Sequence, residues 1–285
     1  MNIPAELLKN MPAYGAFADT ASALAAVDTV CRQAACPNML ECFSRKHAAF
    51  LILGVKCTRA CTFCKLSHGW PAPPVEDEPE RVADAAARLD LRHVVVTSVS
   101  RDDLPDGGAR QFARTITAVR QKTGATVEVL IPDFLGSFSA LQTVTAARPE
   151  VLAHNLETVR RLQKSIRPQA DYDRSLAMLR AARELDDQLL TKAGMMLGLG
   201  EEDGEILEAM ADLRRAGCDI LTLGQYRQPS PAHLPVQRFV LGAGFAMLEQ
   251  AGKQLGFRRV LAGSYVRSSY RAGEVKAFWR DGADA

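Results

Sequence analysis

The sequence lacks any apolar run long enough to cross a membrane. Counting glycine, its longest run is residues 239–248, whereas a membrane-spanning helix needs about 18 apolar residues. The first fourteen residues contain a single lysine and no continuous apolar segment before a small-residue cleavage site, so they do not resemble a secretory signal. We therefore expect a cytoplasmic protein that does not use a membrane.

Strong charge, repeats and low-complexity segments are also missing. The 285 residues include 35 Lys and Arg against 33 Asp and Glu, a net charge of +2 that is too balanced to indicate nucleic-acid binding. Hydrophobic residues make up 47% of the chain, which excludes the disordered and fibrous classes. This length suits one α/β barrel with short additions, because such barrels commonly take roughly 200–250 residues.

Most of the chain alternates short β-branched runs with amphipathic segments. Apolar residues recur with helical spacing over residues 112–119, 172–179 and 206–213. The predicted strands are mostly apolar throughout, as parallel strands buried on both faces should be. They span residues 50–55, 93–99, 126–132, 151–156, 194–199, 220–225 and 259–266.

The repeated strand–helix–strand unit predicts an α/β fold with its site beyond the carboxyl ends of the strands. The pattern alone fits both a closed or partial barrel and an open doubly wound sheet. We divide the chain into three parts. Residues 1–47 form an N-terminal extension that carries three cysteines, residues 48–257 form the barrel, and residues 258–285 form a final strand and tail.

Six of the seven cysteines lie within residues 31–64. Without an export signal, this clustering favours metal binding over disulfides. Cys57, Cys61 and Cys64 have the spacing C-x3-C-x2-C directly after a strand, so one loop can bring them to one metal centre. A closed iron–sulfur cubane takes four protein thiolates, so three leave one iron open to a small molecule.

Zinc is the alternative metal. Three cysteines completed by His47 or His68 would form a site of ordinary composition, in a binding module without catalysis. We favour iron and sulfur because zinc sites usually contain C-x2-C pairs. A brown protein would exclude the zinc alternative.

The stretch CTRACTFC, residues 57–64, resembles the shared motif of the radical S-adenosylmethionine (SAM) superfamily. Its members carry this motif after the first strand of the barrel, typically with an aromatic residue before the last cysteine, here Phe63. The resemblance implies a partial (β/α)6 barrel of TIM type. It also implies a 4Fe–4S cluster whose open iron holds SAM and whose electron cleaves SAM to methionine and a 5′-deoxyadenosyl radical.

A second triplet, Cys31, Cys36 and Cys42, supplies three further thiolates. Its stretch CRQAACPNMLEC resembles the auxiliary-cluster motif of the lipoyl synthases, and similar stretches continue along nearly the whole chain. They include TSVSRDDLPDGGA, HNLETV, IRPQADY, MLGLGE, LTLGQYRQPS, HLPVQRF and VRSSYRAG. In that family the second serine of R-S-S-Y, here Ser269, is the fourth ligand of the auxiliary 4Fe–4S cluster. Without the resemblance, a serine here would be interpreted as a cap or hydrogen-bonding group.

The resemblance implies a sulfurtransferase. Lipoyl synthases insert sulfur at C6 and C8 of an octanoyl chain attached to a lysine of a lipoyl carrier domain or a glycine-cleavage carrier protein. Two SAM molecules are consumed, and the auxiliary cluster is used up as the sulfur source. A radical is needed because unactivated C–H bonds offer neither an acidic proton nor a leaving group. Expected partners are the octanoylated carrier, a reduced flavodoxin or ferredoxin, and an iron–sulfur carrier that repairs the cluster; we expect a monomer.

Polar residues at strand ends are the candidates for binding SAM. Glu157 suits the ribose hydroxyls, and Arg167 suits the carboxylate through bidentate pairing. The full set is Thr97, Ser98, Asn155, Glu157 and Arg167. Each of them also fits an ordinary polar loop residue.

Other residues near the motifs are expected to be structural. Turn, capping, hydrogen-bonding or packing roles are assigned to Arg101, Asp102, Asp103, Gly107, Gly108, His154, Cys218 and His233. The C-terminal segment has a basic bias that we interpret as a docking surface for an acidic carrier. Its basic residues are Arg258, Arg259, Arg267, Arg271, Lys276 and Arg280.

The resemblance is imperfect at Ala193, at Lys65, in residues 241–244, and in the stretch IPAELLKNMP, which lacks the family's tryptophan. None of these departures removes a cluster ligand. The nearest alternative is therefore a paralogue that inserts sulfur into another alkyl or carrier substrate.

Overall fold

Seven parallel strands form the centre of the molecule. The structure, a computed structural model, describes Pro4 and residues 17–275. The strands pair in chain order, and β1 and β9 are the two ends of the described sheet. They are β1 (Ala49–Ile52), β4 (His93–Ser98), β5 (Thr126–Leu130), β6 (Val151–Ala153), β7 (Leu190–Leu197), β8 (Ile220–Gln225) and β9 (Arg259–Gly263).

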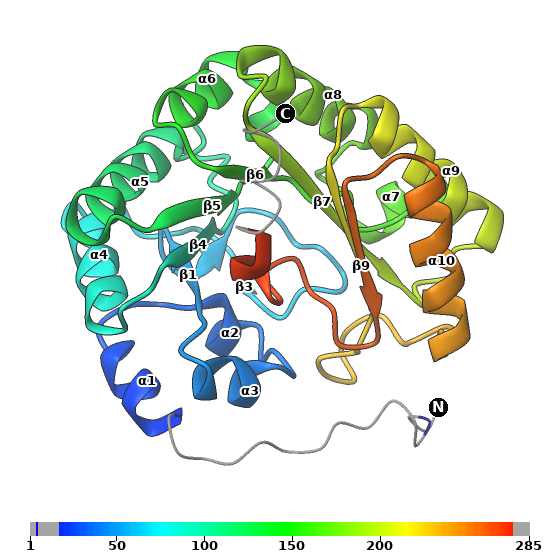
Figure 1. The fold of residues 1–285 in the computed structure, drawn as a ribbon, viewed down its shortest axis with the longest axis horizontal. Coiled ribbons are helices and arrows are strands. Elements are labelled where there is room, and N and C mark those ends of the chain that lie inside the picture. The colour runs from blue at the N-terminus through cyan, green and yellow to red at the C-terminus, as the bar shows by residue number, and fades with distance from the viewer. Residues whose placement is uncertain (1–3, 5–16, 276–285) are drawn as a thin grey trace.

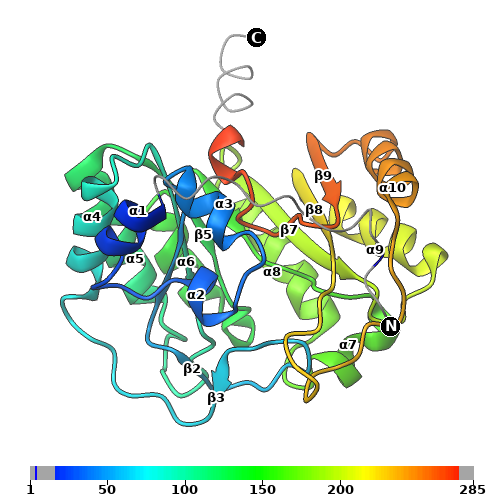
Figure 2. The ribbon, with the colours of Figure 1, turned by 90° about the horizontal axis from the view of Figure 1, so that it is seen from below.

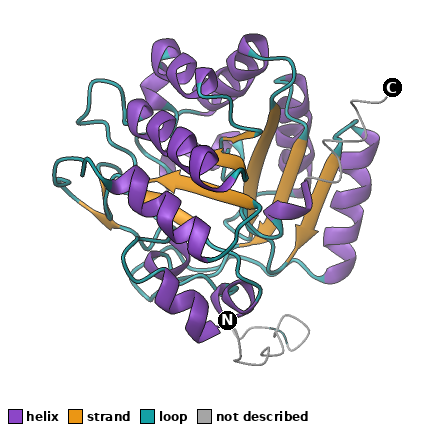
Figure 3. Ribbon diagram, turned by 60° about the vertical axis from the view of Figure 1, so that its left-hand side comes forward, coloured by secondary structure: helices purple, strands orange, loops and turns teal. Residues whose placement is uncertain are grey.

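Helices cover the outer face of this sheet. Figure 1 shows them as an arc outside the strands, and Figure 3 shows the same two layers from the side. They are α4 (Glu78–Arg88), α5 (Ala109–Thr123), α6 (Phe138–Ala146), α8 (Tyr172–Leu185), α9 (Asp203–Arg215) and α10 (Gly242–Gln254), with α7 (Arg160–Ile166) after β6. The partial-barrel prediction is thereby confirmed, and so is the existence of all seven predicted strands.

The inner strands of the sheet are largely buried on both faces, for different reasons. On β5, Val127 and Val129 pack into the hydrophobic core, whereas Glu128 and Leu130 line an internal cavity. The strand predicted from residue 194 begins at Leu190 instead. The early part contains Lys192, which is fully buried and donates from Nζ to Glu128 Oε1 at 2.8 Å. Because the strand was predicted from a run of apolar residues, the charged Lys192 caused its first residues to be missed.

The N-terminal helices lie at the side of the sheet that the strands leave open. They are α1 (Phe17–Ala23), α2 (Val30–Gln33) and α3 (Met39–Ser44), seen below β1 in Figure 1. Asn38 Nδ2 donates to the Tyr265 carbonyl at 2.6 Å, and the Tyr270 hydroxyl donates to Glu41 at 3.2 Å. The N-terminal and C-terminal segments therefore hold each other across the open side.

Short elements mark the two ends of the barrel. The two-stranded pair β2 (Lys56–Cys57) and β3 (Ser67–His68) lies at one end, and η3 (Ala272–Val275) lies at the other, as Figure 2 shows. A further turn, η2 (Phe134–Gly136), follows β5. None of the described helices is long and apolar enough to span a membrane. The stretch IPAELLKNMP lies outside the described residues apart from Pro4, and Lys276 and Arg280 also lie outside them.

The buried pair Lys192–Glu128 generates a prediction about stability. Burial acts to raise the pKa of Glu128, but the Lys192 ammonium and His93 together outweigh burial and hold that pKa below its usual range. We expect Lys192→Met to destabilise the protein by about 3–5 kcal/mol, because it leaves the buried carboxylate with only His93, whose Nε2 lies 3.6 Å from Glu128 Oε2.

The double variant Lys192→Met/Glu128→Leu is the control. It removes both charges, and we expect it to recover most of the loss. Urea unfolding followed by circular dichroism measures both. Equal destabilisation of the single and double variants would contradict this account.

Candidate functional site

One cavity of about 590 Å³ brings the predicted site together. It lies inside the curved sheet and reaches the loops that follow the strands. Five clustered cysteines line it: Cys31, Cys36, Cys57, Cys61 and Cys64. So do all of the predicted SAM contacts and both serines of R-S-S-Y: Thr97, Ser98, Asn155, Glu157, Arg167, Ser268 and Ser269. Cys42 lies in α3, outside this lining, and its backbone N–H donates to the Asn38 carbonyl at 2.8 Å.

Backbone hydrogen bonds fix the conformation of the loop from Cys57 to Cys64. The backbone N–H groups of Ser100 and Arg59 donate to Cys57 Sγ at 3.3 and 3.4 Å. The N–H of Cys64 donates to the Cys61 carbonyl at 3.1 Å, which turns the chain back on itself. These contacts hold the Cys57 sulfur in a defined position.

All seven cysteines are free of disulfides. Burial raises the pKa of Cys31 to about 11 and that of Cys64 to about 12. Without metal these thiols are protonated at neutral pH, so metal binding must release protons.

Arg59, between the first two cysteines, fixes the loop to the barrel. Its buried guanidinium donates to Asp102 at 2.7 and 2.8 Å and to Asp133 Oδ1 at 2.6 Å. Arg174 from α8 donates to the other oxygen of Asp133 at 2.8 Å. Burial acts to raise the pKa of Asp133, but the hydrogen bond and charge of Arg59 outweigh it and hold that pKa far below its usual range.

This network corrects one sequence-based expectation. Asp103 does pair with Arg101, at 2.8 Å through both oxygens, but Asp102 pairs with Arg59 instead. Sequence reasoning missed Arg59 as a site residue, although a charged residue inside a cysteine motif was a signal for it. The turn role of Gly108 is confirmed, since it precedes α5 with φ +92°.

The segment around His233 holds the same loop from another side. His233 Nε2 lies 3.2 Å from the Cys64 carbonyl, and the N–H of Leu234 donates to the Thr62 carbonyl at 3.2 Å. His154 is buried between the Ile131 carbonyl and the Ser175 hydroxyl, and burial lowers its pKa to about 4. Both histidines therefore have the hydrogen-bonding roles expected for them.

Cys218 is fully buried, and its Sγ lies 3.2 Å from the Ile220 carbonyl. It lies outside the cavity lining. The expected packing role of this residue is confirmed.

Four candidates from distant parts of the chain form one hydrogen-bonded group. Asn155 donates from Nδ2 to Glu157 Oε1 at 2.9 Å, and Ser268 Oγ donates to Asn155 Oδ1 at 2.6 Å. Arg167 Nη1 donates to the carbonyls of Asn155 and Leu156 at 3.2 and 3.1 Å. Burial raises the pKa of Glu157, and the charge of Arg167 opposes that shift.

Two of the candidates keep buried polar atoms that have no hydrogen-bond partner among the described residues. They are Ser98 Oγ and Arg167 Nε. Thr97, by contrast, donates from Oγ1 to the Leu130 carbonyl at 3.0 Å. Because buried polar groups are normally satisfied, Ser98 and Arg167 fit a bound polar ligand better than Thr97 does.

Glycines let the C-terminal segment enter the barrel. A Cβ on Gly224 of β8 would lie 2.1 Å from the Val266 carbonyl oxygen. A Cβ on Gly194 of β7 would lie 2.7 Å from Ser268 Oγ. Only the absence of a side chain at both positions allows Ser268 and Ser269 to reach the cavity.

Three of the described arginines in the basic C-terminal segment form ion pairs. Arg258 pairs with Asp219 at 3.2 Å, and Arg259 and Arg271 pair with Glu274 at 3.1 and 3.7 Å. Arg267 lines the internal cavity instead. These contacts give no support to carrier docking through the described arginines of this segment.

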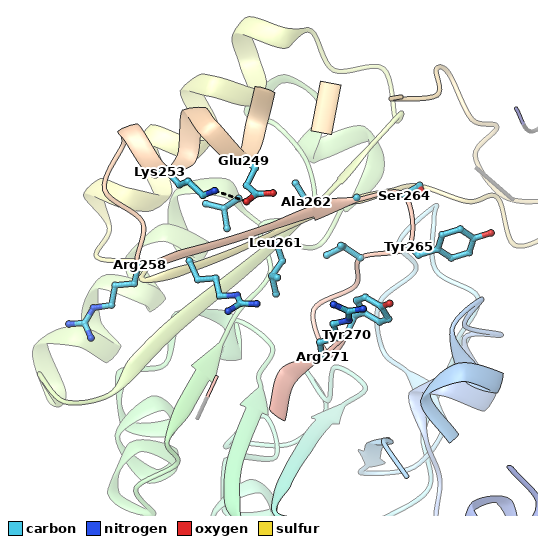
Figure 4. Close-up of a pocket in the computed structure, with 13 residues that line it drawn as sticks. Glu249, Lys253, Arg258, Leu261, Ala262, Ser264, Tyr265, Tyr270 and Arg271 are labelled. Atoms are coloured by element: carbon cyan, nitrogen blue, oxygen red, sulfur yellow. Dashed lines mark ion pairs between the residues drawn. The ribbon is translucent and has the colours of Figure 1, made fainter. Parts of the chain in front are cut away.

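A second cavity of about 600 Å³ lies beside β9 and α10. Figure 4 shows it, with an ion pair between Lys253 and Glu249 at 2.7 Å. It contains none of the cysteines.

The departures from the family pattern lie mostly away from the internal cavity. Ala193 is buried and does not line it, and residues 241–244 lie at the start of α10. Lys65 is exposed at the rim of the cavity.

Comparison with known proteins decides the family. Residues 51–213 match the model of the radical SAM superfamily. Lipoyl synthase of Caldanaerobacter subterraneus is 54% identical over 247 residues, which are 87% of this chain and 87% of that protein. Lipoyl synthase of Geobacter sulfurreducens is 53% identical over 92% of this chain and 86% of its own, and that of Thermus thermophilus is 55% identical over 87% and 77%. This chain belongs to the lipoyl synthase family.

Solved structures agree on the fold. The FeFe-hydrogenase maturase HydG matches with a TM-score of 0.59 at 16% identity, over 73% of this chain and 50% of its own. Methylornithine synthase matches with a TM-score of 0.56 at 14% identity, over 74% and 63%. Both share the partial barrel.

The cofactors of a lipoyl synthase are 4Fe–4S clusters and SAM, and the residues present fit them. Five cysteines from the two triplets line one cavity, and Ser98 and Arg167 offer unused polar atoms in the same lining. The zinc alternative has no such support. His47 and His68 are exposed, and neither lines the cavity that the cysteines line.

The Arg59 network generates a second prediction. We expect Arg59→Gln to lower the iron bound at the C-x3-C-x2-C loop and to alter the electron paramagnetic resonance of the reduced protein, because Asp102 and Asp133 lose their shared cation. Arg59→Lys should restore part of the iron content and of the resonance. The control Arg88→Gln, which alters an exposed side chain at the end of α4, should change neither. Unaltered iron content and resonance in Arg59→Gln would contradict the role of this network.

Proposed function

We propose that this protein forms the lipoyl group by inserting sulfur at C6 and C8 of an octanoyl chain bound to a carrier protein. The observation that carries the proposal is the single cavity lined by Cys57, Cys61 and Cys64 and by two members of the second triplet, Cys31 and Cys36. A radical formed at one side of a shared cavity and a sulfur donor at the other can act on the same alkyl chain, with little movement of the substrate.

Cys57, Cys61 and Cys64 hold the cluster that cleaves SAM. Cys31, Cys36 and Cys42 hold the auxiliary cluster, with Ser269 as its fourth ligand. Ser269 lines the same cavity as Cys31 and Cys36, and the neighbouring Ser268 lies against Gly194, which supports this assignment. When bound, the first cluster and SAM supply hydrogen-abstracting chemistry, and the auxiliary cluster supplies sulfide.

The residues around SAM orient it. The free Nε of Arg167 suits the carboxylate of SAM, and Ser98 Oγ is a second unused polar atom beside it. Glu157 accepts from the ribose hydroxyls, and Asn155 holds Glu157 in place through its amide. Because Asn155 also accepts from Ser268, the SAM site is tied directly to the segment that carries Ser269.

Apolar side chains hold the alkyl chain and exclude water. Leu51, Val95, Leu130 and Val266 line the same cavity as the cysteines. Exclusion of water protects a carbon radical from other hydrogen donors until it meets sulfide.

The partners follow from this chemistry. The substrate is an octanoylated lipoyl carrier domain or glycine-cleavage carrier protein, the electron comes from a reduced flavodoxin or ferredoxin, and an iron–sulfur carrier restores the auxiliary cluster. We place the enzyme in the cytoplasm as a monomer. Its chain divides into an N-terminal extension (1–47), the barrel (48–257) and a C-terminal strand and tail (258–285).

An anaerobic assay tests the proposal. Reconstituted protein is incubated with SAM, dithionite and an octanoyl-lysyl peptide, and the peptide is weighed by mass spectrometry. After the dithiol product is oxidised in air to the disulfide, we expect a gain of two sulfurs and a loss of two hydrogens, at about one turnover. Formation of 5′-deoxyadenosine without thiolated peptide would contradict the octanoyl substrate and favour the paralogue.

Two cysteine variants separate the roles of the triplets in the same assay. We expect Cys61→Ala to abolish SAM cleavage. Cys36→Ala should retain SAM cleavage and lose sulfur insertion. If both variants lost 5′-deoxyadenosine equally, the division of labour would be wrong.

A further inference from the structure

The loop that carries the SAM-cleaving cysteines presents an exposed tryptophan on its outer face. Trp70 is 82% exposed, the most exposed of the large hydrophobic side chains in the described part of the chain. It follows β3, which pairs with β2 so that His68 is opposite Cys57. The N–H of Gly69, the residue before Trp70, donates to the Cys57 carbonyl at 2.9 Å.

Two lysines without partners lie on the same loop. Lys56 precedes the first cysteine, Lys65 follows the last, and both side chains are exposed. Neither forms a hydrogen bond or ion pair with any described residue, in contrast to Arg258, Arg259 and Arg271 near the C-terminus. We call Lys56, Lys65 and Trp70 the loop face.

The loop face has the composition of a docking site. Large exposed aromatic side chains are uncommon on a surface that binds nothing, and tryptophan is enriched where partners dock. Unpaired lysines around it attract an acidic partner and speed its encounter.

The proposed function supplies a reason for a partner at this place. Each SAM cleaved takes one electron from the cluster, and that electron must come from outside the protein. Electron transfer weakens steeply with distance, so a donor must reach the surface next to the cysteines. The loop face is that surface, since one backbone hydrogen bond separates Gly69 from Cys57.

We infer that the loop face docks an acidic flavin-bearing electron carrier of the flavodoxin type. The flat indole of Trp70 suits packing against the exposed edge of the flavin ring, and Lys56 and Lys65 suit the acidic surface around it. The reduced flavin loses one electron, and the oxidised cluster gains it. This inference rests on the proposed function and adds where the electron enters and from which kind of donor.

Binding of the donor tests the inference without catalysis. Oxidised flavodoxin is titrated calorimetrically into the reconstituted enzyme at low and high salt. We expect Trp70→Ala to raise Kd at least about tenfold, and Lys56→Gln/Lys65→Gln to raise Kd and remove most of its salt dependence. Met247→Ala, which alters a 69% exposed side chain on α10, and Lys164→Gln are matched controls that should bind as the unaltered protein does.

Activity with two reductants separates this inference from the proposed function. With octanoyl-lysyl peptide and dithionite, Trp70→Ala should form 5′-deoxyadenosine at the unaltered rate, whereas with reduced flavodoxin its rate should fall. Failure of the unaltered protein with dithionite would overturn the proposed function itself.

Three results would overturn the inference while leaving that function intact. The first is unchanged flavodoxin binding by Trp70→Ala. The second is a Trp70→Ala variant that loses binding to a ferredoxin but still binds flavodoxin. The third is a defect that appears only with the octanoylated carrier protein, which would make the loop face a carrier site.

Discussion

The structure depends on the unclosed edge of its sheet. The seven described strands pair in chain order and leave β1 and β9 unpaired with each other, so the interior is open at one side. The N-terminal helices and the segment after β9 cover that side and are joined by the contacts of Asn38 with Tyr265 and of Tyr270 with Glu41. Both covering segments carry proposed ligands of the auxiliary cluster. When they cover the open side of the barrel, they therefore also bring these ligands together.

The polar groups inside the barrel are of two kinds. Some are held by ion pairs and hydrogen bonds, and others keep unused hydrogen-bonding capacity. Arg59, Asp102, Asp133 and Arg174 satisfy one another around the cysteine loop. Such a network costs desolvation and gives a defined position rather than much stability. Ser98 Oγ and Arg167 Nε keep unused hydrogen-bonding capacity at the cavity. The rigid groups therefore hold the loop, and the available groups remain for a ligand.

Local sequence patterns predicted most of the fold and the cysteine triplets. Apolar strands and thiol spacing are properties of a few neighbouring residues, so they can be recognised without the fold. Pairs that join distant residues could not be predicted in this way. The partner of Lys192 is 64 residues away, and that of Asp102 is 43 residues away.

The ion pairs of the C-terminal arginines illustrate the same limit. Their charge was visible in the sequence, but Asp219 and Glu274, which pair with them, were not recognisable as partners. Ser269 was indicated only by the family resemblance, because no spacing rule connects it to cysteines more than two hundred residues earlier.

The most direct test of the account is the iron content of Gly224→Ala. The added Cβ would meet the Val266 carbonyl, so it should displace the segment that carries Ser269. We predict that this variant loses about half of its iron, the auxiliary cluster, and still cleaves SAM, while Gly204→Ala, whose Cβ would meet nothing within 4 Å, keeps all of its iron. Full iron content and normal sulfur insertion in Gly224→Ala would contradict the claim that the C-terminal segment builds the auxiliary site.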